Sequence, residues 1–444
     1  DVRTISGLDV EPVIATEKEI LRAIKEAYGV RALVDKASSI VKPEDLASIT
    51  EMQSADDAPV ISIVNSIISQ AIKERASDIH VEPTDNNLRV RYRIDGELRE
   101  AFSFPIKTHA LLISRLKIMS ELDIAEKRLP QDGRINFREG DREIDIRVSS
   151  LPTVIGEKIV LRILDRASVI VDIKRLGFAE KNLAVYKKLY SQSYGMILVT
   201  GPTGSGKTTT LYSTLTGLNK PTKNIITVED PTEYRLDGIN QVQVNAKAGL
   251  TFAAGLRSIL RQDPNIIMVG EIRDGETADI AIRAALTGHL VLSTLHTNDS
   301  IGAVSRLVDM GVEPFLVASS VLGILAQRLV RKICPECKES YVLETDSPER
   351  AFFGEHYQDG TTLYRGAGCP SCANTGYRGR MAIHEVFPIS KGLRELITEK
   401  ASGEKLKALA AQEGMTTMQY DGFQKVLAGE TTINEIMRVA YAEL

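Results

Sequence analysis

The stretch that decides the fold is Met196–Leu215, MILVTGPTGSGKTTTLYSTL, which passes from apolar to glycine-rich to threonine-rich residues. Its first four residues, Met196 to Val199, are all apolar and predict a short buried strand, and residues 208–215 predict the start of a helix. A glycine-rich turn that leads into a helix places backbone N–H groups at the positive end of the helix dipole. The stretch therefore predicts an anion-binding loop between a strand and a helix.

The middle of this stretch matches a specific phosphate-binding pattern. G-x-x-x-x-G-K-[ST] is satisfied by Gly201, Gly206, Lys207 and Thr208. In this P-loop pattern, backbone N–H groups surround the phosphates, the lysine reaches the β and γ oxygens, and the hydroxyl ligates Mg²⁺. A merely flexible glycine turn is the alternative, and the flanking strand and helix disfavour it. The predicted nucleotide-binding residues here are Gly201, Pro202, Thr203, Gly204, Ser205, Gly206, Lys207, Thr208 and Thr209, with Thr208 as the magnesium ligand.

Length and composition bound the remaining possibilities. A chain of 444 residues predicts two or three domains. The net charge of −4 argues against a globally basic nucleic-acid footprint. No run approaches the roughly 18 apolar residues that span a bilayer, and the opening DVRTISGLDVEP does not resemble a signal peptide. We expect a cytosolic protein, and because the chain does not begin with Met, its first residues can be a trimmed boundary.

The four cysteines of the chain form two C-x-x-C pairs, Cys334 with Cys337 and Cys369 with Cys372. In a reducing compartment, such a set predicts a tetrahedral thiolate site for a structural Zn²⁺. A redox role is the alternative, but neither pair lies in a thioredoxin-like βαβ pattern. We therefore expect a small zinc-binding lobe at residues 330–380.

The pattern of apolar residues divides the chain into three parts. Residues 1–57 are interpreted as the remnant of a truncated N-terminal domain followed by a linker. Residues 58–170 predict an α+β domain, in which alternating residues on both sides of an Asp95-Gly96 turn indicate a hairpin. Residues 171–444 alternate strands and helices, which is typical of an α/β domain with a doubly wound parallel sheet. This last part includes the cysteine lobe and a C-terminal helical region.

Carboxylates follow two of the predicted strands of the α/β domain. The apolar strand at residues 266–269 ends in Gly270-Glu271, where many P-loop enzymes place an acid associated with Mg²⁺. Glu271 can hold a metal-bound water or polarise the attacking water. Glu229 and Asp230 end a neighbouring strand and can add oxygens to the metal shell. A solvated carboxylate at a strand end is the alternative for each of them.

A histidine follows the next predicted strand. His296 ends the segment LVLSTLH, and a neutral imidazole at this position can hydrogen-bond the γ-phosphate. The alternative is a histidine whose hydrogen bonds go to nearby backbone. His289 is closer to the start of that strand and is the weaker candidate.

Taken together, these segments resemble the secretion ATPase superfamily, and most closely its type II secretion and type IV pilus assembly members, the GspE/PulE-like group. The similar segments in that family are called Walker A, the Asp box, Walker B and the His box. They correspond here to GPTGSGKTTT (201–210), ITVEDPTEY (226–234), IIMVGEIRDGETADIA (266–281) and LTGHLVLSTLHTND (286–299). The resemblance extends from about residue 60 through the cysteine region.

The resemblance implies both an architecture and a function. Such relatives are hexameric ATPases in which a PAS-like domain precedes a RecA-like motor domain, and the tetracysteine site is typical of the secretion and pilus assembly branch. It implies a cytosolic motor that hydrolyses ATP with Mg²⁺ and is peripherally associated with the inner membrane. That motor would act through inner-membrane platform proteins, with possible contact to the membrane surface. Type II secretion through assembly of a pilus-like fibre is the first reading, and type IV pilus assembly is the alternative.

The resemblance also implies roles for further residues. Glu271 corresponds to the family's catalytic glutamate, and Lys207 is the P-loop lysine. Phosphate-contacting arginines of the family correspond to Arg147 and Arg162 in the first domain and to Arg257 and Arg261 in the motor domain. Arg147 and Arg162 lie on adjacent predicted strands, where two guanidinium groups can converge on one anion. Ordinary surface ion pairing is the alternative for this pair.

Two rival functions belong to other classes. The first is a nucleic-acid motor, because RGAGCPSCANTGYRGR places Arg365, Arg378 and Arg380 around a cysteine pair. The acidic net charge and the lack of aromatic residues between these arginines disfavour it, so no nucleic acid is expected as a partner. The second is a scaffold that binds ATP without turnover, which the presence of Lys207 and Glu271 disfavours.

Overall fold

The computed structural model describes residues 14–16, 20, 58–164, 172–344 and 347–440. Contacts within the chain divide it into two compact units, Asp1–Asp165 and Arg166–Leu444. The predicted remnant domain and linker at residues 1–57 lie outside the described residues, apart from 14–16 and 20. Among the described residues, no helix combines the length and the apolar character that crossing a membrane requires.

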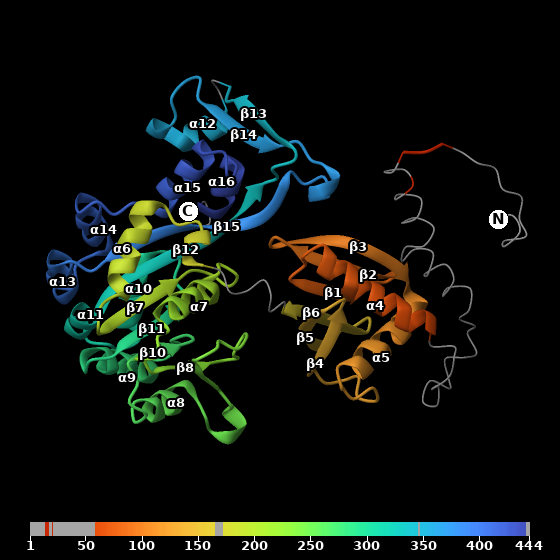
Figure 1. Ribbon diagram of the computed structural model, residues 1–444, viewed down its shortest axis with the longest axis horizontal. Coiled ribbons are helices and arrows are strands. Elements are labelled where there is room, and N and C mark those ends of the chain that lie inside the picture. The colour runs from red at the N-terminus through yellow and green to blue at the C-terminus, as the bar shows by residue number, and fades with distance from the viewer. Residues whose placement is uncertain (1–13, 17–19, 21–57, 165–171, 345–346, 441–444) are drawn as a thin grey trace, which may run out of the picture. The chain divides into compact units, whose positions relative to one another are not determined.

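The first unit is an α+β structure with one antiparallel sheet of order β3-β2-β1-β6-β5-β4 (Figure 1). The strands are β1 (Asp78–Pro83), β2 (Asn87–Ile94), β3 (Glu97–Pro105), β4 (Gln131–Glu139), β5 (Arg142–Pro152) and β6 (Glu157–Leu164). Helices α4 (Ala58–Lys73) and α5 (His109–Met119) share one apolar core with the sheet. The two helices therefore cover the same face of the sheet.

Alternation along the strands explains which face is covered. Leu88, Val90 and Tyr92 of β2 are buried in the core, while the arginines between them lie on the opposite face. The Tyr92 hydroxyl donates a hydrogen bond to the backbone oxygen of Ile67 on α4, at 2.6 Å. The predicted hairpin is present, because Asp95 and Gly96 both have positive φ angles, 50° and 93°, between β2 and β3. The sheet thus presents a charged face on the side away from its helices.

The second unit contains a seven-stranded sheet of order β15-β12-β7-β11-β10-β8-β9. Its strands are β7 (Gly195–Thr200), β8 (Ile225–Glu229), β9 (Asn240–Gln243), β10 (Ile266–Val269), β11 (Leu290–Leu295), β12 (Val321–Ile333) and β15 (Tyr377–Pro388). All neighbours pair in parallel except β15, which is antiparallel to β12. The predicted α/β class is confirmed, with one antiparallel strand at the sheet edge.

Helices pack on both faces of this sheet (Figure 1). Met196 and Leu198 of β7 belong to one apolar core and Ile197 and Val199 to the other, so this strand is buried on both sides. One face is covered by α6 (Glu180–Tyr190) and α7 (Lys207–Leu218). The other face is covered by α8 (Phe252–Ile259), α9 (Gly275–Leu286), α10 (Ser300–Asp309), α11 (Pro314–Ser320), α13 (Lys391–Thr398) and α14 (Gly403–Gln412).

A small lobe extends from the long strands β12 and β15. It contains the antiparallel pair β13 (Lys338–Val342) and β14 (Thr362–Gly366) and the helix α12 (Pro348–Phe353). Helices α15 (Met418–Leu427) and α16 (Ile433–Ala440) form an apolar core with this lobe and with both long strands. The cysteine pairs lie at the base of the lobe, because Cys334 directly follows β12 and Cys372 precedes β15.

Candidate functional site

The glycine-rich loop, defined here as residues 201–206, joins the end of β7 to the start of α7. Gly201 and Gly206 adopt φ angles of 143° and 88°, which disfavour any residue with a side chain. A Cβ atom on Gly201 would lie 2.5 Å from the backbone oxygen of Gln327, so the loop also passes too close to β12 for one. The predicted strand, loop and helix are therefore all present, with the loop at the carboxyl edge of the sheet.

Lys207 is the first residue of α7, and its side chain turns back into the loop. Its Nζ donates hydrogen bonds to the backbone oxygens of Gly201 at 2.6 Å and Pro202 at 3.1 Å. Burial lowers the pKa of Lys207 to about 8, although the charge of Glu271 opposes this shift. Thr208, the next residue, is exposed. The loop thus combines a buried ammonium group with an accessible hydroxyl at a helix N-terminus, which suits a phosphate and its metal ion.

Glu271 follows β10 at the same edge of the sheet. Its Oε2 lies 3.0 Å from Nε2 of His296, and its Oε1 accepts a hydrogen bond from Arg273. Burial raises the pKa of Glu271, but the bonds and charges of Arg273 and His296 outweigh that effect and hold the pKa below its usual value. The carboxylate is therefore ionised at neutral pH. An ionised carboxylate can orient a water molecule or accept a proton from it.

The two predicted histidines have different surroundings. His296 follows β11, the strand beside β10, and its half-exposed ring contacts Glu271. The Nδ1 atom of His289 instead lies 3.0 Å from the backbone oxygen of Ala284, before the start of β11. The structure thus brings His296, and not His289, to the acid.

Glu229 and Asp230 are adjacent in sequence, but their side chains have different environments. Glu229 is only 3% exposed and accepts hydrogen bonds from Tyr212, from Thr227 at 2.5 Å and from Gln241 at 3.0 Å. Asp230 is exposed, and its charge acts on Arg273. Glu229 therefore joins β8 to α7, whereas Asp230 presents its carboxylate to solvent on the side of Glu271.

Arg257 lies on α8 and Arg261 lies in the turn that follows it, away from the glycine-rich loop in sequence. Arg257 donates to Glu276 at 2.5 Å, and Arg261 donates to the backbone oxygen of Arg257 at 2.9 Å and to Ser258 at 3.2 Å. Both guanidinium groups are thus engaged on the α8–α9 surface. Within the second unit, these contacts do not bring either arginine to Lys207.

Arg147 and Arg162 are direct register partners on β5 and β6 of the first unit. They lie on the charged face of the sheet, since the alternate residues Ile146 and Leu161 are buried in the core. The Nε atom of Arg162 donates to Oδ1 of Asp78 at 3.0 Å, while 60% of the arginine side chain is exposed. The pair thus offers two neighbouring guanidinium groups, one of them oriented by a buried carboxylate.

The four cysteines form one cluster at the base of the lobe. Their Sγ atoms all lie within 4.8 Å of one another, and three of the separations are 3.8, 3.8 and 3.7 Å. Four sulfurs at about 2.3 Å from a tetrahedral Zn²⁺ would stand about 3.8 Å apart. Backbone N–H groups of Gly368 and Gly376 point at Cys337 and Cys372, both at 3.3 Å, as expected around thiolates. The residues therefore fit one tetrahedral metal ion.

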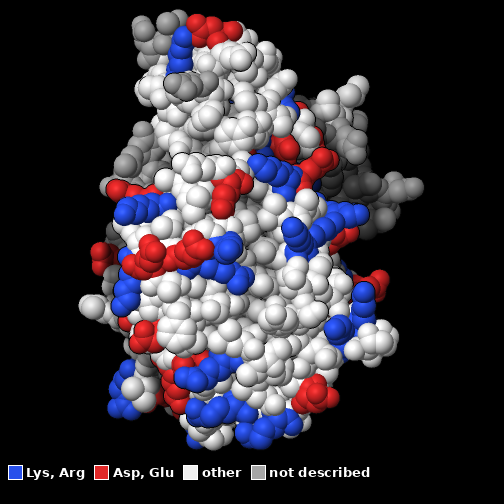
Figure 2. Space-filling model, turned by 90° about the vertical axis from the view of Figure 1, so that its left-hand side faces the viewer, with Lys and Arg blue, Asp and Glu red and all other residues white. Residues whose placement is uncertain are grey.

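The arginines near the cysteines form ion pairs on the surface. Arg365 donates to Glu339 at 2.6 Å and Arg378 to Glu336 at 3.2 Å. On the face of the molecule shown in Figure 2, basic and acidic side chains are interspersed. This face therefore lacks, among its described residues, the continuous basic stripe typical of nucleic-acid binding.

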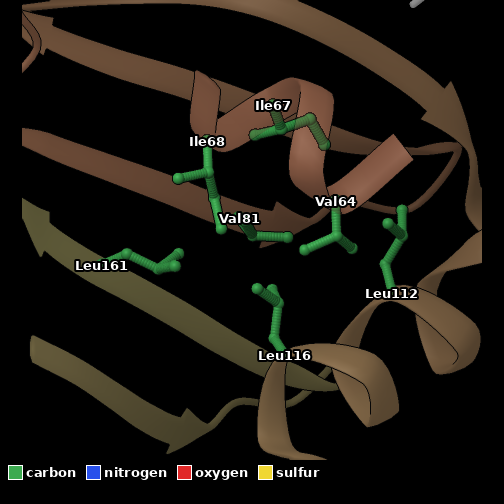
Figure 3. Close-up of a pocket in the computed structure, with 7 residues that line it drawn as sticks. All are labelled: Val64, Ile67, Ile68, Val81, Leu112, Leu116 and Leu161. Atoms are coloured by element: carbon green, nitrogen blue, oxygen red, sulfur yellow. The ribbon is translucent and has the colours of Figure 1, made fainter. Parts of the chain in front are cut away.

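A separate apolar pocket lies inside the first unit, between α4, α5 and the sheet (Figure 3). Its lining side chains are Val64, Ile67, Ile68, Val81, Leu112, Leu116 and Leu161. The cavity volume is about 10 Å³, which is no more than one water molecule needs, and its walls offer no polar partner. We interpret it as a small packing gap in the core.

Two residues at the site were not among the predicted site residues, although Arg273 lies within the quoted segment 266–281. Arg273 contacts Glu271, and Gln327 of β12 contacts the glycine-rich loop. A signal for the second was present, because Gln327 and Arg328 interrupt the otherwise apolar run of a buried strand. Such an interruption indicates that a polar group has specific partners, but it does not say which ones.

Comparison with known proteins places this geometry in context. The family described as Type II/IV secretion system protein matches residues 53–438. Type II secretion system protein E of Pseudomonas aeruginosa is 52% identical over 407 residues, covering 92% of this chain and 80% of that protein. Type IV pilus assembly ATPase PilB of Myxococcus xanthus is 49% identical over 454 residues, covering 98% of this chain and 79% of that protein.

Solved structures show the same fold. The pilus retraction motor PilT with bound ADP is 28% identical, with a TM-score of 0.56, covering 84% of this chain and 96% of that one. The ATPase DotB of Legionella pneumophila is 20% identical, with a TM-score of 0.63, over 86% and 96% of the two chains. By sequence over almost its whole length, the chain belongs to the Type II/IV secretion system protein family.

Proposed function

We propose that this chain is an ATPase motor that hydrolyses ATP with Mg²⁺ to power type II protein secretion. The observation that carries the proposal is the placement of an ionised Glu271, held by His296, at the sheet edge that also carries the glycine-rich loop and Lys207. Relatives at about 50% identity are named Type II secretion system protein E and Type II secretion system ATPase E. The second unit then corresponds to a RecA-like motor domain and the first to a PAS-like domain.

Nucleotide binding would begin at the glycine-rich loop. The β- and γ-phosphate oxygens are stronger acceptors for an ammonium group than backbone carbonyls, so Lys207 would exchange its bonds to Gly201 and Pro202 for bonds to phosphate. The arriving negative charge would also favour the protonated lysine. The exposed hydroxyl of Thr208 would be a ligand of Mg²⁺, which supplies charge neutralisation of the phosphates when bound.

Hydrolysis requires a water molecule in line with the γ-phosphate, and Glu271 is the residue placed to orient it. Its ionised state makes the carboxylate a hydrogen-bond acceptor for that water. His296 would donate a hydrogen bond to the γ-phosphate or to Glu271, and so respond to phosphate release. Exposed Asp230 is the better candidate for an outer metal-shell ligand, with buried Glu229 supporting the strand beneath it.

Arginines from outside the motor domain would complete the site. In the transition state the γ-phosphoryl oxygens carry dispersed charge, which guanidinium groups stabilise. We propose that Arg147 and Arg162 reach the phosphate when the first unit closes on a motor domain, and that Arg257 and Arg261 join the site in an assembled ring. Coupled closure and release round a hexamer would produce mechanical work on inner-membrane platform proteins, at the cytoplasmic side of the membrane.

A structural Zn²⁺ would be held by Cys334, Cys337, Cys369 and Cys372. The sulfur separations match a tetrahedral site, and the ion would cross-link the two chain segments at the base of the lobe. The lobe would then be a rigid extension of β12 and β15.

Type IV pilus assembly is the second candidate, because the Myxococcus xanthus relative named a pilus assembly ATPase is 49% identical. The test has two parts. Phosphate release from ATP by the purified chain, lost in Glu271→Gln, tests the ATPase. Co-purification of the full chain with inner-membrane proteins from its own cells, identified by mass spectrometry, decides between secretion and pilus platforms, and recovery of neither contradicts the motor assignment.

A further inference from the structure

Gln327 is a buried residue whose side-chain amide hydrogen-bonds to the glycine-rich loop. It lies in β12, which runs parallel to β7, and the last register pair of these strands is Ala326 with Thr200. Gln327 therefore stands one residue beyond that pair, where the loop leaves β7. Its side chain is only 1% exposed.

Both ends of this amide are bonded to the segment that forms the loop and the first turn of α7. Its Nε2 donates to the backbone oxygen of Ser205 at 2.7 Å, and its Oε1 accepts from the hydroxyl of Thr210 at 2.8 Å. A carbonyl can only accept, so these two partners also determine which way the amide is oriented. If the amide were flipped, its oxygen would face the Ser205 carbonyl, and that hydrogen bond could not form.

The bond to Ser205 has a consequence on the other side of the same peptide. In a planar trans peptide, the C=O of one residue and the N–H of the next point in opposite directions. A Ser205 carbonyl held toward β12 therefore turns the N–H of Gly206 toward the open side of the loop. Gly206 is close enough that a Cβ there would lie 3.1 Å from Nε2 of Gln327.

We propose that Gln327 is a positioning residue that aims the Gly206 N–H at the phosphate, an inference that rests on nucleotide binding by this loop. A glycine-rich loop is flexible when unrestrained, and fixing a peptide before binding removes an ordering cost from the bound state. Burying an amide in a strand that is covered on both faces is unfavourable unless the amide has hydrogen-bond partners. Both hydrogen-bond partners of the amide, Ser205 and Thr210, belong to the loop and the first turn of α7.

The test uses Gln327→Met, which keeps the length of the side chain and removes both hydrogen bonds. ADP affinity is measured by isothermal titration calorimetry on the purified full chain. We expect ADP to bind about tenfold more weakly, the loss typical of one well-placed hydrogen bond. For ATP turnover, we expect KM to rise more than kcat falls, because the N–H contacts phosphate in both the ground and transition states.

Two variants separate positioning from stability. Asn182→Leu removes a comparable buried amide, which donates to the His384 oxygen at 3.3 Å and accepts from Thr416 at 3.2 Å, neither of which belongs to the loop or to α7. It should lower the Tm while leaving ADP affinity within about twofold of wild type. Gln327→Glu keeps the acceptor for Thr210 but removes the donor to Ser205, so it should also weaken ADP binding.

The outcomes distinguish the positioning role of Gln327 from the proposed function. Wild-type protein that does not bind ADP contradicts the proposed function, and the inference with it. If wild type binds ADP and both Gln327 variants bind it equally well, the positioning role is wrong and the proposed function stands. Equal loss of ADP affinity in Asn182→Leu would also overturn the inference, because general destabilisation would then explain the effect.

Discussion

The Nε2 atom of His296 lies 3.0 Å from Oε2 of Glu271, across the ends of two neighbouring parallel strands. The histidine and the acid are 25 residues apart in sequence. Their contact makes the protonation of the acid depend on the histidine, because a donated hydrogen bond favours the charged carboxylate. A change at His296 would therefore affect the residue that we propose orients the attacking water.

Glu271→Gln should keep nucleotide binding and reduce ATP turnover by about 100-fold or more, because the amide cannot act as a base. Phosphate release and ADP affinity measured on the same preparation check this. Asp279→Asn is a matched control, since Asp279 is an exposed acid that pairs with Arg283 on α9. Wild-type turnover in Glu271→Gln would show that another group orients the water.

His296→Ala should shift the acidic limb of the pH profile of kcat/KM to higher pH. The pKa of Glu271 is held below its usual value partly by His296, so removing this donor raises that pKa. Activity at low pH depends on ionised Glu271. As the pH falls, the variant should therefore lose activity at a higher pH than the wild type does. An unchanged acidic limb, with the variant folded and active, would contradict the coupling.

ADP affinity should weaken as the pH rises above about 8, where burial has placed the pKa of Lys207. Below that pH the lysine is an ammonium ion that attracts phosphate, and above it the free protein loses this charge. Lys207→Arg should bind ADP more weakly but show little change between about pH 7 and 9.5, because guanidinium stays charged. Calorimetry of wild type and variant in the same buffers over this pH range compares how steeply the ADP affinity of each changes with pH.

One Zn²⁺ per chain should co-purify with the protein, and Cys337→Ser should lose it and lower the Tm. Three remaining thiolates bind the ion less tightly, and the small lobe depends on this cross-link. Elemental analysis after gel filtration and a thermal melt measure both effects. Metal-free protein that has two disulfides and the native Tm would exclude the zinc site.

Arg147→Ala and Arg162→Ala should each lower kcat strongly, on the order of 10³-fold if they act as delivered arginines, with ADP affinity largely kept. Arg138→Ala on β4 is the control, because this arginine is exposed and donates to the nearby Gly140 oxygen at 3.2 Å. Specific activity should also rise with protein concentration if a ring assembles the site. Unchanged kcat in both variants would leave the two arginines as surface residues.

Features that depend on contiguous residues could be predicted from the sequence. The glycine-rich loop was found because its ligands are backbone groups, so the spacing of Gly201, Gly206 and Lys207 carries the whole pattern. The Asp95-Gly96 hairpin was found because the turn needs two residues with positive φ. The cysteines were grouped by pairing and number, and the structure brings their sulfur atoms together.

Features that depend on which strand lies beside which could not be predicted in this way. Glu229 and Asp230 looked equivalent, yet Tyr212 of α7 and Gln241 of β9 bury the first and leave the second exposed. The sequence alone placed both at a strand end, and only the packing of a helix and a neighbouring strand separated them.

The contact between Gln327 and Ser205 spans 122 residues, and the one between Arg162 and Asp78 spans 84. The first joins a side chain of β12 to the backbone of the loop, and the second joins side chains on β6 and β1. Both depend on how the strands are aligned in the sheet, which is set by the burial of whole strands and not by the residues that meet. The sequence by itself therefore determined the residues of the glycine-rich loop and of the cysteine cluster. The tertiary structure decided which side chains contact the loop and which carboxylates pair with the arginines, because these partners come from strands that are distant in sequence.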